Sequence, residues 1–225
     1  VQTCALPICA LSQAAESLDQ VRRDLGHFDA HALRLVGAER QALLRSRATT
    51  YVWLSAIMER FVKEWMKAIC HDFSSLGVPW KDVRPSIFSV ACGSELQAIS
   101  DGVKKELWAK RIAIFNRTLG NEPVRLNHAF VPLDGKTIRP RHMEDIWSVF
   151  GLPMPIFPSP VHSAVLTTVA DYRNDLAHGD ESPSTIGAKL TYADVLRYVQ
   201  RFEDMIEHCC LSTEKYFRQG MYLRS

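Results

Sequence analysis

The sequence predicts an all-α protein, a bundle of helices in one domain. Two observations lead to this prediction: apolar residues recur every three or four positions over long segments, and no stretch alternates apolar and polar residues for long enough to build a sheet. The composition is typical of a globular chain, because 47% of the 225 residues are hydrophobic and 23% are charged. No apolar run approaches the roughly 20 residues that span a bilayer, so we expect no membrane segment.

The beginning of the chain does not fit this pattern. Residues 1–9 lack an initiator Met and resemble the translation of a sequencing-adaptor oligonucleotide, so we expect them to be an artefact. Residues 10–225 then form a single domain, with a core at about 35–215. The first helix is expected from about Ala10 to Leu25, ending at Gly26.

The second expected helix, at about 33–73, is the longest, and Gly77 closes it. Its best-defined part carries apolar side chains on one face, namely Tyr51, Leu54, Met58, Phe61, Trp65 and Ile69. The third expected helix, at 94–118, has Ser94 as its N-cap and four apolar residues at helical spacing, Leu96, Ile99, Val103 and Leu107.

A proline-rich insert separates these helices from the end of the chain. Residues 120–141 contain prolines and the turn dipeptide Asp134-Gly135, which predict a long loop with a short extended piece at 129–131. A short helix at 143–150 stops at Gly151. Four further prolines, between positions 153 and 160, then prevent regular structure.

Two helices complete the predicted fold. The helix at 161–178 is expected to end because Gly179 follows its last residue. Its apolar side is expected to carry Val161, Val165, Val169, Tyr172 and Leu176. The helix at 191–216 has the clearest amphipathic pattern in the sequence, and Thr191 with Asp194 resembles an N-cap signature.

Charge and missing motifs narrow the possible functions. The formal net charge is only +2, so any contact with nucleic acid must come from a local patch of basic residues. The sequence has no P-loop, no dinucleotide-binding glycine motif, no G-x-S-x-G and no H-E-x-x-H.

Metal and thiol sites are poorly supported. His27 and His31 would share a helix face, but no second pair with metal-ligand spacing accompanies them. We expect the cysteines beyond residue 9, which form no C-x-x-C, to be small buried side chains in a reducing cytoplasm. The clusters Cys70-His71-Asp72 and His208-Cys209-Cys210 lack the geometry or the ligands for chemistry. We therefore expect no metal and no cofactor.

One segment does carry a chemical signal, Asp171-Tyr172-Arg173-Asn174-Asp175-Leu176-Ala177-His178-Gly179. It resembles the R-x4-6-H motif of the HEPN superfamily (higher eukaryotes and prokaryotes nucleotide-binding), in which the motif ends a helix and a final amphipathic helix follows. The long helix carrying Glu59 resembles the first core helix of that family. The insert around Asp134-Gly135-Lys136 looks like that of the RiboL-PSP-HEPN and MAE-type groups.

The resemblance implies a metal-independent endoribonuclease that acts as a toxin or antiviral effector, with RNA as substrate. It also implies a homodimer, and a cognate antitoxin as a possible partner. On this interpretation His178 transfers a proton, Arg173 binds the scissile phosphate, and Asn174 orients the phosphate or His178, with Asp175 and Tyr172 in support. The product would be a 2′,3′-cyclic phosphate.

The spacing of the motif leaves its geometry open. Residues five apart on an ideal helix lie about 140° from each other, so Arg173 and His178 do not point the same way. Either the helix ends at His178 and frees the ring, or motifs from two chains meet across a two-fold axis.

Other interpretations also stay open. Arg173 could pair with Asp171 or Asp175 while His178 caps the helix, without catalysis. The chain could also be a non-catalytic RNA- or nucleotide-binding module, a dimeric assembly module, or a subunit that masks another protein.

Overall fold

The computed structural model describes residues 6–29, 35–101 and 107–224. Within these ranges it contains helices and no β-strand, which confirms the all-α prediction. The α-helices are α1 (Leu6–Asp29), α2 (Gly37–Ser75), α3 (Phe88–Ala91), α4 (Gly93–Ser100), α5 (Leu107–Arg117), α6 (Pro140–Phe150), α7 (Pro160–His178), α8 (Pro183–Ala188) and α9 (Tyr192–Arg218). Short 3-10 turns lie at Trp80–Asp82, Pro85–Ile87 and His128–Phe130. None of the described helices is both long and apolar enough to cross a membrane.

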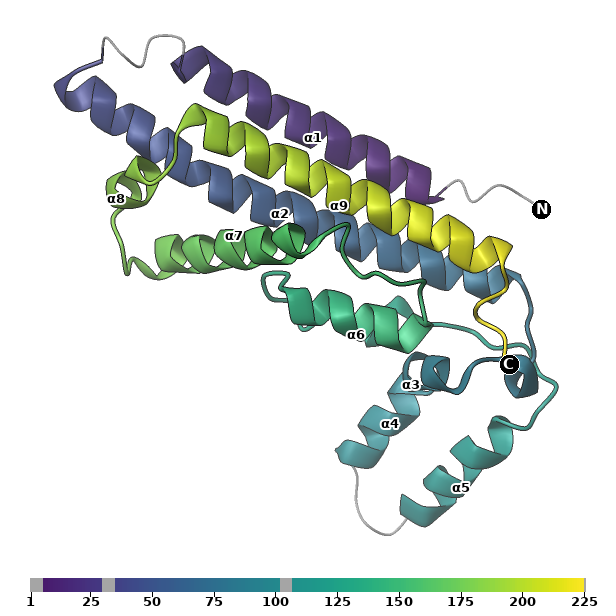
Figure 1. Ribbon diagram of the computed structural model, residues 1–225. Coiled ribbons are helices and arrows are strands. Elements are labelled where there is room, and N and C mark those ends of the chain that lie inside the picture. Colours follow the sequence, from purple (N-terminus) through teal and green to yellow (C-terminus); the bar gives the residue numbers. More distant parts are fainter. Residues whose placement is uncertain (1–5, 30–34, 102–106, 225) are drawn as a thin grey trace.

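Three long helices form the centre of the fold. Figure 1 shows α1, α2 and α9 running alongside one another, and each of them contacts the other two. The shorter helices α7 and α8 pack against α2, and α7 also touches α9 and α6. Helices α4 and α5 project away from this bundle (Figure 1).

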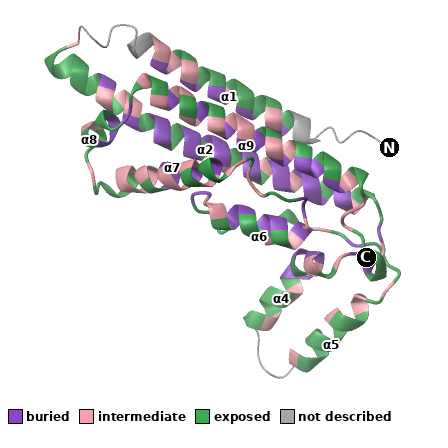
Figure 2. Cartoon of the chain, in the orientation of Figure 1, coloured by how far each residue is buried: buried purple, intermediate pink, exposed green. Residues whose placement is uncertain are grey.

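The core lies where the predicted apolar face of α2 meets its neighbours. All six of the residues expected on that face, from Tyr51 to Ile69, are buried. The indole Nε1 of Trp65 donates a buried hydrogen bond of 2.8 Å to Oγ1 of Thr213, which ties α2 to α9. Figure 2 shows the resulting band of buried residues along α2 and α9, whereas α4 and α5 are largely exposed or intermediate.

The first helix is longer than predicted. It continues through Gly26 to Asp29, and five small or aliphatic residues on its inner face are buried: Ala10, Ala14, Leu18, Val21 and Leu25. Gly26 keeps a helical backbone, and a Cβ there would lie 3.0 Å from the hydroxyl of Tyr192. The glycine therefore permits a close approach of α9, and the prediction that it ends the helix is wrong.

The region from 93 to 141 differs most from the prediction. The single helix expected at 94–118 is two helices, because α4 ends at Ser100 and α5 begins at Leu107. The turn dipeptide Asp101-Gly102 falls at this break. Ser94 lies inside α4 and not at its N-cap, and no residue of α5 is buried. Val103 is outside the described residues.

The insert is also more helical than expected. The extended piece predicted at 129–131 is a 3-10 turn at His128–Phe130, where Oδ1 of Asn127 accepts the N–H of Ala129. Helix α6 begins three residues earlier than predicted, with Pro140 in its first turn. It ends at Gly151 as predicted, in the left-handed conformation with φ 69°.

The last helices largely follow the prediction, with one addition. Thr191 and Asp194 form the expected N-terminal capping box of α9. Helix α8 was not predicted, and it packs so closely on α2 that a Cβ on Gly187 would lie 1.7 Å from the carbonyl oxygen of Leu44. Only glycine fits there. In α7 the first predicted apolar residue, Val161, is exposed.

Candidate functional site

The end of α7 is shaped by Gly179. Its φ of 76° is a left-handed conformation that glycine adopts at little cost, and its N–H donates to the carbonyl of Asp175. The N–H of Asp180 donates to the same carbonyl at 3.0 Å. His178 is therefore the last residue of the helix, as predicted, and its side chain is exposed.

The Arg173 side chain is half-buried and directed by its neighbour. Its NH1 group donates to Oδ1 of Asn174 at 3.3 Å, and Oγ1 of Thr137 donates to the same oxygen at 3.5 Å. The amide oxygen of Asn174 thus receives donors from the motif and from the insert. Asn174 therefore contacts Arg173, while its expected role of orienting the phosphate or His178 stays a prediction.

Three of the motif residues line one cavity of about 350 Å³. Arg173, Asn174 and His178 all contribute to its wall. Asn174 and His178 are four residues apart and share a helix face, and the long Arg173 side chain turns toward Asn174. One chain therefore brings the guanidinium and the imidazole to the same cavity, although an ideal helix separates them.

The rest of the cavity wall was missing from the predicted site. The insert and the start of α6 contribute Asp134, Gly135, Lys136, Thr137, Arg139, Arg141 and His142, and α2 contributes Glu59. The sequence signal for the insert residues is the density of basic residues around Pro140, with three cations between positions 136 and 141. That signal does not indicate which helix these basic residues pack against, so it could not identify the site.

The cavity is predominantly basic. Four cations line it, Lys136, Arg139, Arg141 and Arg173, against the carboxylates of Glu59 and Asp134. The cavity is thus a local patch of basic residues on a chain whose net charge is only +2.

Asp134 is the anionic centre of the insert. Desolvation raises its pKa, but the backbone N–H of Lys136, the His142 ring and the Lys136 ammonium outweigh this effect. The pKa of Asp134 therefore lies below its ordinary value, and the carboxylate is ionised at neutral pH.

Two predicted supporting residues do not line the cavity. The ring of Tyr172 packs against Tyr51, with ring centroids 4.8 Å apart, and the ammonium of Lys189 lies 4.9 Å from its centre. Asp175 contributes its backbone carbonyl to the end of α7. Their roles in support of the motif stay predictions.

The non-catalytic pairing considered for the motif is not what the described residues show. Asp171 pairs with Arg139 at 2.8 Å, while Arg173 donates to Asn174. The helix end is capped by backbone N–H groups, and no hydrogen bond from His178 to a carbonyl occurs in the described ranges.

The thiols are unsuited to nucleophilic chemistry. Burial raises the pKa of Cys70 to about 12 and that of Cys210 to about 11. Burial likewise raises the pKa of Cys209 well above its usual range. These thiols stay protonated near neutrality. Cys70 and Cys209 are buried, as predicted, whereas Cys210 is only half-buried.

The histidine clusters in the described part of the chain have structural partners. Nε2 of His208 donates to the carbonyl of Pro155 at 2.8 Å, and the ring stacks on Trp147. Among the described residues, no group of three or more His, Cys, Asp or Glu could hold a metal ion. The side chains of His27 and His31 lie outside those described.

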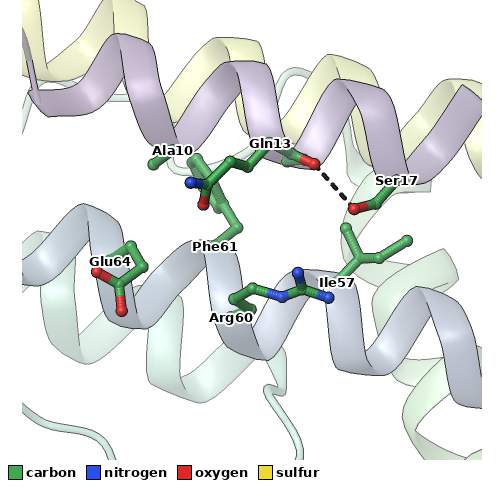
Figure 3. A pocket seen from close by; sticks show the side chains of 8 residues that line it. Ala10, Gln13, Ser17, Ile57, Arg60, Phe61 and Glu64 are labelled. Carbon is green, nitrogen blue, oxygen red and sulfur yellow. Dashed lines mark hydrogen bonds between the residues drawn. The ribbon is translucent and has the colours of Figure 1, made fainter.

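A second hollow lies between α1 and α2 (Figure 3). Its volume is about 10 Å³, and its walls are formed by the side chains labelled in Figure 3, such as Gln13, Ser17 and Arg60. That volume accommodates no more than a water molecule, so the hollow is a packing gap and not a ligand site.

Comparison with known proteins places the chain in a family. Residues 10–216 match the family model described as HEPN_MAE_28990-like HEPN, whereas no curated protein and no solved structure matches. The match includes most of α1, so it begins earlier than the core expected at 35–215. It supports a nucleotide-related function in general terms. Because the match covers most of the chain and the fold is an all-α bundle, the protein belongs to the HEPN superfamily.

Proposed function

We propose that the protein is a metal-independent endoribonuclease. The observation that carries this proposal is the basic cavity that Arg173 and His178 line together. A guanidinium can stabilise the charge that develops on a phosphodiester during cleavage, and an imidazole can transfer a proton.

RNA supplies its own nucleophile for this reaction. The 2′-hydroxyl attacks the adjacent phosphorus while a base removes its proton, and the bond from phosphorus to the 5′-oxygen breaks. The leaving 5′-oxygen takes up a proton, so the products are a 2′,3′-cyclic phosphate and a 5′-hydroxyl. His178 is exposed at the end of α7 and acts as a proton-transfer group.

Arg173 stabilises the charge that develops on the phosphoryl oxygens. Its planar fork matches two of these oxygens. The hydrogen bond to Asn174 restricts the guanidinium before substrate arrives, which lowers the cost of ordering it in the transition state. Asn174 is thus a positioning residue.

The proposal includes a two-fold homodimer in which the motifs of two chains face one cleft. It is supported by the position of the motif: α7 contacts α2 and α9, while His178 is open to solvent. The resemblance to the RiboL-PSP-HEPN and MAE-type groups further supports a toxin or antiviral effector that acts on cytoplasmic RNA and is controlled by a cognate antitoxin.

The test is cleavage of RNA by the purified protein in EDTA, followed by analysis of the ends. We expect 2′,3′-cyclic phosphate ends from the parent protein. The variants Arg173→Ala and His178→Ala should each lose at least about 100-fold in rate while keeping the parent's oligomeric state. Cleavage that requires a divalent ion would contradict the mechanism.

The same experiment separates the alternative, a non-catalytic binding module. In that case the parent yields no cyclic phosphate, and His178→Ala binds RNA as tightly as the parent.

A further inference from the structure

The insert forms a wall of the cavity that the motif does not account for. We call residues 134–142 the insert wall; they comprise the loop before α6 and its first turn. Every residue of this wall that lines the cavity lies more than 30 positions before Arg173 in the sequence. Its position beside the motif therefore depends on tertiary contacts.

Two contacts hold the middle of the insert wall against α7. The buried Thr137 donates its hydroxyl hydrogen to Asn174, and the Arg139 guanidinium lies 2.8 Å from a carboxylate oxygen of Asp171. Both contacts involve residues within two positions of Arg173. The cations on either side of this segment, Lys136 and Arg141, are thereby held at the same cavity as Arg173.

These two cations share one carboxylate. Oδ2 of Asp134 accepts a hydrogen bond of 3.1 Å from Arg141 and lies 3.9 Å from the Lys136 ammonium, while its Oδ1 accepts the backbone N–H of Lys136. Two positive charges against one negative charge leave an excess of one. The side chains of Lys136 and Arg141 are 77% and 65% exposed, so both heads are accessible to a ligand.

A buried histidine adds a donor to the same place. Nδ1 of His142 accepts the backbone N–H of Arg139 at 2.9 Å, so a neutral ring carries its hydrogen on Nε2. Nε2 is buried and lies 3.3 Å from Oδ1 of Asp134, but it has no aligned hydrogen-bond partner among the described residues. The nearest acceptor for this N–H is therefore the Asp134 carboxylate, so His142 helps to hold in place the anion that Lys136 and Arg141 share.

We propose that Lys136 and Arg141, supported by His142, form a second phosphate subsite that binds a phosphate of RNA next to the scissile one. The identity of the ligand as RNA rests on the proposed function. The subsite itself rests on the excess charge and on the exposed cationic heads of Lys136 and Arg141, which the contacts of the insert with α7 hold beside the motif. Although the net charge of the protein is only +2, this subsite would bind the RNA strand locally and position its scissile phosphate at Arg173 and His178.

The first test measures binding of a single-stranded RNA in which every 2′-hydroxyl is methylated, so that it cannot be cleaved. We compare the parent with Lys136→Gln/Arg141→Gln and with the control Lys215→Gln, which removes an exposed cation from α9. The double variant should bind about tenfold more weakly at low salt. The slope of log Kd against log salt should fall by about 0.7, the value for one single-stranded phosphate. The control should match the parent in both measurements.

The second test adds a single phosphate. A 2′-O-methyl dinucleotide has one linking phosphate, and versions with a terminal 5′- or 3′-phosphate have two. In the parent, one of the extra phosphates should strengthen binding several-fold, and this gain should disappear in the double variant. Inorganic phosphate is tested alone as a free anion. If it binds as tightly as the dinucleotides, the site binds any phosphate, and a subsite for RNA is overturned.

The outcomes separate this inference from the proposed function. An equal gain from the extra phosphate in parent and double variant would overturn the subsite, whatever the cleavage result. Failure of the parent to cleave RNA, together with loss of the gain in the double variant, would overturn the proposed reaction alone. The charge-preserving double variant Lys136→Arg/Arg141→Lys should retain the gain in binding. That result would exclude disruption of the fold at these two positions as the reason why the Gln double variant loses the gain.

Discussion

The ion pair between Arg139 and Asp171 offers a test in which two neighbouring substitutions should act in opposite directions. The pair joins the insert to α7, with 2.8 Å between NH1 and Oδ1. We consider Arg139→Gln, Asp171→Asn and the double variant. Each single substitution removes one charge beside the cavity, and the double variant removes one charge of each sign.

The effect on stability should be small. The Arg139 and Asp171 side chains are 33% and 53% exposed, and an exposed pair of this kind contributes about 0–1 kcal/mol to the free energy of unfolding. All three variants should therefore remain folded, with urea midpoints close to that of the parent.

The effect on RNA binding should be larger and should differ in sign. Two unit charges 4 Å apart in water interact by about 1 kcal/mol, which corresponds to about a fivefold change in Kd. Loss of the Arg139 cation should weaken binding by about this factor, whereas loss of the Asp171 carboxylate should strengthen it by a similar factor. The double variant should resemble the parent.

The assay is fluorescence anisotropy with the uncleavable RNA at low and at moderate salt. Screening should reduce both effects as salt rises, because exposed charges interact over about 10 Å at 0.1 M ionic strength. If both single variants weaken binding, the pair acts by holding the insert in place, and the charge argument is refuted. If neither changes binding, the cavity is not where RNA binds.

Further predictions concern the helix end, the core, the insert and a buried thiol. Gly179→Ala should cost about 1 kcal/mol in urea unfolding, because φ is 76° and a Cβ there meets no atom within 4 Å, so only the backbone is strained. Thr213→Val should cost about 1–3 kcal/mol in the same measurement, since it leaves the buried Trp65 indole N–H without an acceptor. The pKa of Asp134 in the folded protein lies below its ordinary value of 3.8. The ionised carboxylate therefore contributes its full stabilisation above pH 3.8. This contribution is lost as the pH falls through the pKa of the folded protein. Acid unfolding curves should accordingly show a shallower loss of stability below about pH 4 for Asp134→Asn than for the parent. Cys70, whose pKa burial raises to about 12, should resist a thiol reagent at pH 8 in the folded protein and react once urea unfolds it. Rapid modification of Cys70 in the native state would contradict the burial argument.

Helix signals that are local in the chain predicted most of the bundle. The spacing of apolar residues from Tyr51 to Ile69 located the buried face of α2, and the Thr191 capping box located the start of α9. Gly179 fixed the end of α7 for a reason that involves only backbone conformation. Gly26 shows the limit of such reasoning, because its role depends on the Tyr192 side chain of another helix.

The motif could be found from the sequence, but the cavity around it could not. Arg173, Asn174 and His178 are neighbours along one helix, so their pattern is visible in the chain itself. Lys136 lies in a proline-rich loop, and Arg141 and His142 lie in the first turn of α6, where no sequence pattern indicates what they pack against. Their placement depends on contacts of Thr137 and Arg139 with α7, between residues more than 30 positions apart. Local patterns therefore specify which helices form and where they end, while long-range packing specifies which charges share a cavity, because that packing depends on side chains from several elements at once.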